Sequence, residues 1–253
     1  LRQYYAALYG FGNAAMAIAW DISYMTMHGV AKLWYLFAPM HPFYLLEEID
    51  TIEYFNGSEY QETSKAIASK SYLHGRIRKS YKNGTVIHVN YNKAEDWAIS
   101  SPRGGSVILP PWGFYATSPD GKIVSCSVRA ADGTIIDYCR TPEQLYLDAW
   151  QGSKSVEGLV INGAGAVRKL DEKTVVFYPL GSVPRGQTLP NEGVEEAVID
   201  LEYWLNSTTS NVTVTGKLPD GSWHPFAASG DKGKLTIHPS GNYRQYKIEL
   251  QAN

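Results

Sequence analysis

Four Asn-Gly or Asp-Gly dipeptides, each between runs rich in β-branched and aromatic residues, constrain the fold of this chain most. They are Asn83-Gly84, Asp120-Gly121, Asp132-Gly133 and Asp220-Gly221. Such dipeptides accept the left-handed backbone of tight hairpin turns, and the segment SYKNGTVIHVNYN predicts a type I′ hairpin at Asn83-Gly84. From about Ile52 onward the chain is therefore predicted to be mainly β, with antiparallel strands.

Further strand signals continue to the end of the chain. GAVRKLDEKTVVFYPL predicts another hairpin, and four short strands follow at a spacing typical of β-sandwiches: AVIDLEYWL, NVTVTGKL, GKLTIHP and YRQYKIELQ. A stretch rich in Pro and Gly at about 179–193 predicts a linker. We therefore expect two or three antiparallel β-sandwich modules, divided into a region at 51–185 and a C-terminal, immunoglobulin-like or carbohydrate-module-like sandwich at 186–253.

Residues 1–50 predict a helical segment instead. Apolar residues recur at three- and four-residue spacing up to Phe37, and Pro39 and Pro42 are expected to end the helix. Its apolar positions go nearly all the way round, so the helix at 14–37 needs neighbours on several sides. The segment TPEQLYLDAW predicts the one other short helix.

Charge and motifs exclude several classes of function. The 253 residues carry a formal net charge of −2 and contain no block of Lys and Arg, so we expect no nucleic-acid partner. Asp21, His28 and Lys32 make the most apolar stretch a poor membrane span. No metal-binding, phosphate-binding or nucleophile motif is present, so no cofactor and no metal site are predicted.

The aromatic content of 13%, with 18 Tyr and 7 Trp, is the compositional outlier. Aromatic rings suit cross-strand packing in β-sheets, and they also suit sugar binding, because apolar sugar faces stack on them. For any single ring, packing is the favoured interpretation.

Cys126 and Cys139 flank the predicted hairpin CSVRAADGTIIDYC. With Asp132 and Gly133 as the two central turn residues, the cysteines face each other at a non-hydrogen-bonded position, where a cross-strand disulfide is geometrically feasible. Two buried free thiols are the alternative, and a register error of one residue would place the thiols on opposite faces of the hairpin.

The order of features in residues 5–118 resembles the C-terminal part of large bacterial glycoside hydrolases. The segments that carry the resemblance are YYAALYGFGNAA, EEIDTIEYFNG, YKNGTVIHVNYN and ILPPWGFYATSPDG. The resemblance implies that residues 1–50 are the last strand and helix of a TIM-type (β/α)₈ barrel, followed by β-sandwich domains. It further implies that the remainder of the same enzyme, or another copy, covers the helix at 14–37.

Under that resemblance the chain is a C-terminal fragment that braces a catalytic barrel and binds an oligosaccharide or polysaccharide. Only the barrel end supplies candidate substrate-binding residues, namely Tyr9, Asn13, Trp20 and Asp21. Asp21 is equally interpreted as a helix cap. No pair of carboxylates stands out as catalytic, so the parent is expected to be the hydrolase. The alternative is a self-contained, non-catalytic carbohydrate-binding or cell-surface protein, and either role implies secretion.

Overall fold

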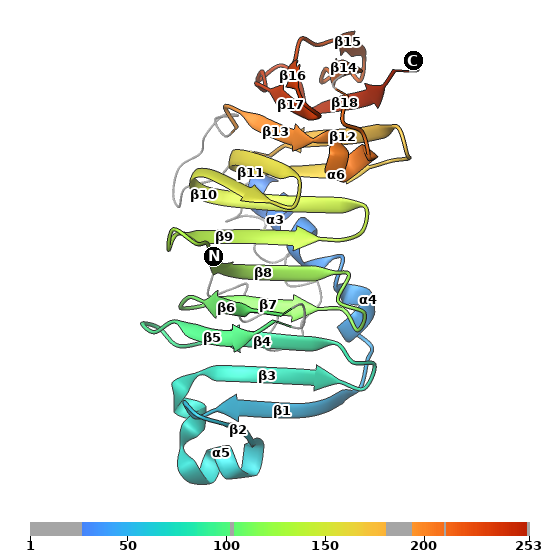
Figure 1. Ribbon diagram of the computed structural model, residues 1–253. Coiled ribbons are helices and arrows are strands. Elements are labelled where there is room, and N and C mark those ends of the chain that lie inside the picture. The colour runs from blue at the N-terminus through green and yellow to red at the C-terminus, as the bar shows by residue number, and fades with distance from the viewer. Residues whose placement is uncertain (1–26, 102–103, 181–193, 210, 252–253) are drawn as a thin grey trace. The chain divides into compact units, whose positions relative to one another are not determined.

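A computed structural model of the protein describes residues 27–101, 104–180, 194–209 and 211–251 (Figure 1). The described part is mainly β, and its ladders are antiparallel, as the turn dipeptides predict. The chain divides into two compact units, a first unit from Val30 to Pro142 and a second from Glu143 onward that also takes in residues 26–29. No helix within the described ranges is long and apolar enough to cross a membrane.

The first unit consists of one seven-stranded sheet, one separate hairpin and short helices. The sheet has the order β9-β8-β7-β4-β3-β1-β2, and β5 pairs only with β6. The elements in chain order are α3 (Met27–Phe37), α4 (His41–Tyr44), β1 (Ile49–Phe55), β2 (Tyr60–Glu62), α5 (Thr63–Ser69), the 3₁₀ helix η2 (Ser71–His74), β3 (Arg76–Tyr81), β4 (Val86–Asn90), β5 (Trp97–Ser100), β6 (Ser106–Leu109), β7 (Phe114–Thr117), β8 (Val124–Arg129) and β9 (Ile135–Arg140).

Three of the hairpin loops have three residues, one more than a two-residue type I′ turn. The loop between β3 and β4 has three residues, because the Tyr81 amide donates to the Thr85 carbonyl at 2.9 Å. Gly84 closes the loop with φ +92°, whereas Asn83 is not among the residues with positive φ. A type I′ turn needs positive φ at both central residues, so that prediction is wrong. The Ala130–Thr134 and Leu218–Ser222 hydrogen bonds enclose loops of the same three-residue kind.

This longer loop also overturns the register expected for the two cysteines. Cys126 lies opposite Tyr138, and Cys139 lies opposite Ser125. Since successive side chains of a strand point to opposite faces, the two thiols lie on opposite faces of the β8–β9 hairpin. Both are free and fully buried, and the disulfide prediction is therefore wrong. Burial raises the pKa of both thiols, that of Cys139 to about 12.

Helix α3 packs on one face of the first unit's sheet. Leu33, Leu36 and Phe37 are buried, and the Phe37 ring lies 5.9 Å from that of Phe114 on β7. The Ser125 hydroxyl on β8 donates to the Leu36 carbonyl at 2.6 Å. The helix end at Phe37, two residues before Pro39, confirms the prediction. Pro42 does not end this helix, because it lies in the first turn of α4.

A buried ion pair also joins α3 to the first unit's sheet. The Lys32 ammonium pairs with the carboxylate of Asp137 on β9. The Asp137 side chain is fully buried and that of Lys32 is 8% exposed. Trp34 points the other way and is 64% exposed, so the described part of the helix is amphipathic rather than apolar all round. Residues 1–26 of the barrel end expected at 1–50 lie outside the described residues.

The second unit forms the sheet path β15-β14-β18-β12-β11-β10, with β13, β17 and β16 added beside the first half of β11. Its elements in chain order are β10 (Gln144–Val156), β11 (Leu159–Lys169), β12 (Thr174–Pro179), β13 (Ala197–Asp200), α6 (Leu201–Leu205), β14 (Val212–Lys217), β15 (Trp223–Pro225), β16 (Ser229–Asp231), β17 (Lys234–Ile237) and β18 (Gln245–Leu250).

Two predictions for the second unit are corrected. TPEQLYLDAW is not a helix but contributes to β10, whose residues 145–149 are buried on both sides, so their pattern carries no strand alternation. Only the first half of AVIDLEYWL is a strand, because Asp200 caps α6 by accepting the Tyr203 amide at 3.1 Å. The domain boundary expected at 185/186 stays a prediction, and β12 pairs with β18 within the second unit.

Candidate functional site

The four residues proposed from the sequence to bind substrate, Tyr9, Asn13, Trp20 and Asp21, lie outside the described residues. Residues 181–193 of the linker predicted at about 179–193 lie outside the described residues as well. The remaining candidates are clusters of polar and aromatic side chains on the two sheets.

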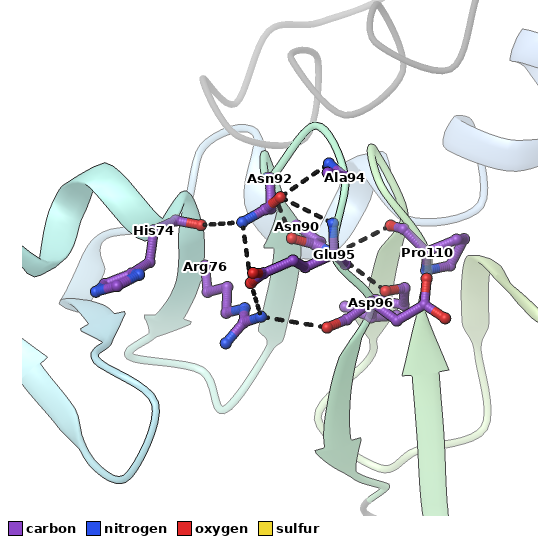
Figure 2. Close-up of polar contacts among 9 residues, drawn as sticks. His74, Arg76, Asn90, Asn92, Ala94, Glu95, Asp96 and Pro110 are labelled. Atoms are coloured by element: carbon purple, nitrogen blue, oxygen red, sulfur yellow. Dashed lines mark hydrogen bonds and ion pairs between the residues drawn. The ribbon is translucent and has the colours of Figure 1, made fainter.

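A polar cluster joins the segment after β4 to the start of β3 (Figure 2). Arg76 donates to the Glu95 carboxylate at 2.9 Å and to the backbone oxygen of Asp96 at 3.3 Å. The Asp96 carboxylate accepts two hydrogen bonds from Arg129, at 2.5 and 2.9 Å. Each of these acids is thus hydrogen-bonded to a guanidinium, an arrangement that suits a structural role.

Asn90 is the centre of the same cluster and is fully buried. Its amide nitrogen donates to three backbone oxygens, those of Glu95, Leu109 and Pro110, at 2.9 to 3.1 Å. These contacts join both ends of the β5–β6 hairpin to β4, as Figure 2 shows for part of the set. The asparagine that ends the VIHVN strand therefore has a structural role, satisfying buried carbonyl groups.

The carboxylates with perturbed pKa values do not provide a general acid. Glycoside hydrolysis needs one carboxyl group whose pKa is raised by its surroundings. A hydrogen bond from Lys65 lowers the pKa of Glu59. Hydrogen bonds within their own turns lower the pKa of three exposed aspartates, Asp120, Asp171 and Asp220. Within the described part of the chain, no group of three or more His, Cys, Asp or Glu residues is arranged to hold a metal ion.

An aromatic cluster covers the face of the first unit's sheet opposite α3. The Trp97 ring lies 5.8 Å from that of Phe55 and 5.7 Å from the His88 imidazole. The Arg78 guanidinium stacks 3.7 Å from the centre of the Tyr60 ring and pairs with Glu53 at 2.6 Å. Because these rings contact one another, packing accounts for them. The His88 Nδ1 atom is buried and has no hydrogen-bond partner among the described residues.

The face of β14, β15 and β18 in the second unit is different, because its side chains are partly open to solvent. On the opposite face of these strands, Val214, Tyr246 and Ile248 are buried. The register brings Trp223 beside Lys217, and Thr215 beside Lys247. We call these four residues together the Trp223 platform. Its alternation with the buried face is typical of an antiparallel sheet with one solvated side.

Trp223 is the aromatic residue of this platform and is 39% exposed. The ammonium groups of Lys217 and Lys247 lie 5.5 and 5.4 Å from its ring centre. Lys247 also pairs with Glu249 at 3.0 Å, and both of these side chains are partly exposed. The Thr215 hydroxyl oxygen is buried and has no hydrogen-bond partner within the described ranges.

Sequence reasoning did not single out Trp223 or the two lysines. The segment LPDGSWHP, in which Trp223 follows an Asp-Gly turn between Ser222 and His224, gave no signal for an exposed ring. Polar residues on both sides of a strand Trp favour a ring that faces the core, because successive side chains point to opposite faces of a sheet. Pairing with β14 and β18 could not be read from the same pattern, since it depends on long-range register.

The described fold defines this chain as a protein of antiparallel β-sheets with an open, aromatic-bearing sheet face. Comparison with known proteins adds no narrower class. No protein-family model matches the chain, no curated protein matches it, and no solved structure matches it.

Proposed function

We propose that this chain is a non-catalytic carbohydrate-binding β region of a glycoside hydrolase-like protein, and that the Trp223 platform holds the glycan. The observation that carries the proposal is a partly exposed Trp ring on a sheet face beside polar side chains. A pyranose ring stacks its apolar C–H face on such an indole, and neighbouring donors and acceptors bind its hydroxyl groups.

The supporting geometry is that of a binding face and not of a reactive centre. Among the described residues, the carboxyl groups with a shifted pKa all have a pKa below its ordinary value. The acids of the polar cluster in Figure 2 are paired with arginine. The chemistry would then belong to a catalytic barrel beside this chain. An extracellular or cell-surface location is part of the same proposal.

Bracing of the barrel is a second part of the proposal, and Trp34 is the observation that favours it. A Trp that is 64% exposed on an otherwise well-packed helix offers an apolar contact for a neighbouring domain. The alternative is a self-contained carbohydrate-binding or cell-surface protein. It is favoured by the way α3 packs on this chain's own sheet, through the Lys32–Asp137 pair and the Ser125–Leu36 hydrogen bond.

Affinity electrophoresis of the full chain in gels containing soluble polysaccharides tests the binding role. Trp223→Ala is expected to weaken binding at least tenfold, since loss of a Trp that dominates a binding site costs about 2 kcal/mol or more. Trp34→Ala is the matched control, because it removes an exposed Trp from the first unit, and it should leave retardation unchanged. Retardation that is equal in the wild type and the Trp223→Ala variant, or no retardation by any polymer, would refute the proposal.

A further inference from the structure

We infer that the Trp223 platform selects acidic glycans, whose carboxylate groups are bound by Lys217 and Lys247. This inference rests on the proposed glycan-binding function of the same face. It concerns the chemical class of the ligand, which the aromatic ring alone does not decide, because neutral and acidic sugars both stack on indole.

The first step is the position of the two ammonium groups. Each lies less than 6 Å from the Trp223 ring centre, and they come from different strands, β14 and β18. A sugar stacked on this ring would present its ring substituents next to both side chains. Lysine offers only hydrogen-bond donors and a positive charge, so its best partner is an anionic substituent.

The second step is that this positive charge is local. The chain as a whole has a formal net charge of −2, so a general attraction to polyanions is not expected. Lys217 has the Trp223 ring as its described contact, and Lys247 shares its charge with the exposed carboxylate of Glu249. A ligand carboxylate would replace weak, solvent-exposed interactions with closer ion pairs.

The third step concerns the Thr215 hydroxyl, which lies between Pro225 and Lys247 in the register. Its oxygen is buried without a hydrogen-bond partner among the described residues. A buried hydroxyl that lacks a partner is unfavourable, and movement of the lysine side chain toward a ligand would give it access to one. The platform thus combines a stacking ring, two cations and a buried hydroxyl group without a hydrogen-bond partner among the described residues.

Affinity electrophoresis with two kinds of polymer tests the inference. Sodium polygalacturonate and sodium alginate are the acidic probes, and dextran and galactan are the neutral ones. The acidic polymers are expected to retard the full chain, with retardation that falls as salt rises. Lys217→Gln and Lys247→Gln should each weaken binding roughly threefold, and the double variant roughly tenfold.

The matched control is Lys234→Gln, which removes an exposed lysine on β17 of the same unit. It should leave binding unchanged, and an equal loss in this control would overturn the inference by showing a nonspecific charge effect. Binding of dextran or galactan that depends on Trp223 and not on the lysines would also overturn it, while leaving the proposed function intact. Absence of binding to all four polymers would refute both.

Discussion

The imidazole of His88 provides the sharpest test of the structure. It lies on β4 within the aromatic cluster, is 6% exposed and has an unpartnered Nδ1 atom among the described residues. Burial, with a smaller contribution from the positive charge of Arg78, lowers its pKa from 6.5 to about 4. The groups that face it are Arg78, paired with Glu53, and the hydroxyl-bearing rings of Tyr60 and Tyr115.

The sign of the effect follows from these two pKa values. Above pH 6.5 neither the folded nor the unfolded state protonates His88, so the group adds no pH dependence. As the pH falls from 6.5 toward 4, the unfolded chain takes up a proton that the folded chain refuses, and stability is lost. The loss is about 2 kcal/mol at pH 5 and about 3 kcal/mol at pH 4, relative to pH 7.

Urea unfolding of the wild type and His88→Phe at pH 7 and pH 5 measures this loss. The Phe variant keeps a ring of similar size and cannot titrate, so its stability should fall by about 2 kcal/mol less than that of the wild type over this interval. His224→Phe, at an exposed position on β15, should keep the full wild-type dependence. A histidine NMR titration that places the His88 pKa near 6.5, or equal pH dependence in both chains, would refute the reasoning.

Two further predictions concern the first unit. Lys32→Met should destabilise the protein by about 3 to 5 kcal/mol, because it leaves the buried Asp137 carboxylate without its cation, and the double variant Lys32→Met/Asp137→Leu should recover most of that loss. Urea unfolding checks both variants, and a double variant no more stable than Lys32→Met would contradict the ion-pair argument. A thiol titration of Cys126 and Cys139 without reductant should find two thiols under denaturing conditions and slow reaction in the folded protein. Finding no thiols after denaturation would contradict the observed register.

The sequence predicted strand content well because turn chemistry is local. Gly84, Gly133 and Gly221 all lie in hairpin loops with positive φ, as expected of their dipeptides. Loop length was not predictable in the same way, since two- and three-residue loops accept the same Asp-Gly or Asn-Gly pair. Contacts outside the hairpin, such as the hydrogen bond from Ser125 to the Leu36 carbonyl, are consistent with the three-residue register. They join residues far apart in the sequence, so the residues around the turn do not predict them.

Strand β10 shows why burial on both sides defeats assignment from the sequence. Residues 145–149 of β10 are all buried, so no periodicity distinguished strand from helix. The candidate site was equally hard to find, because Trp223 acquires its lysine neighbours from β14 and β18, and β18 lies more than twenty residues further along the chain. The aromatic excess suited both packing and sugar binding, and only strand pairing distinguished Trp223 as the proposed ligand-binding ring.

The three-residue loop at Ala131–Gly133 has a consequence for the chemistry of the two cysteines. Because of this loop the two cysteines do not face each other. Cys126 lies opposite Tyr138, and Cys139 lies opposite Ser125. The two buried thiols lie on opposite faces of the hairpin, and the folded chain is expected to tolerate oxidising and reducing surroundings alike. The cysteine pair is therefore no marker of export, and the case for secretion depends on the ligand alone.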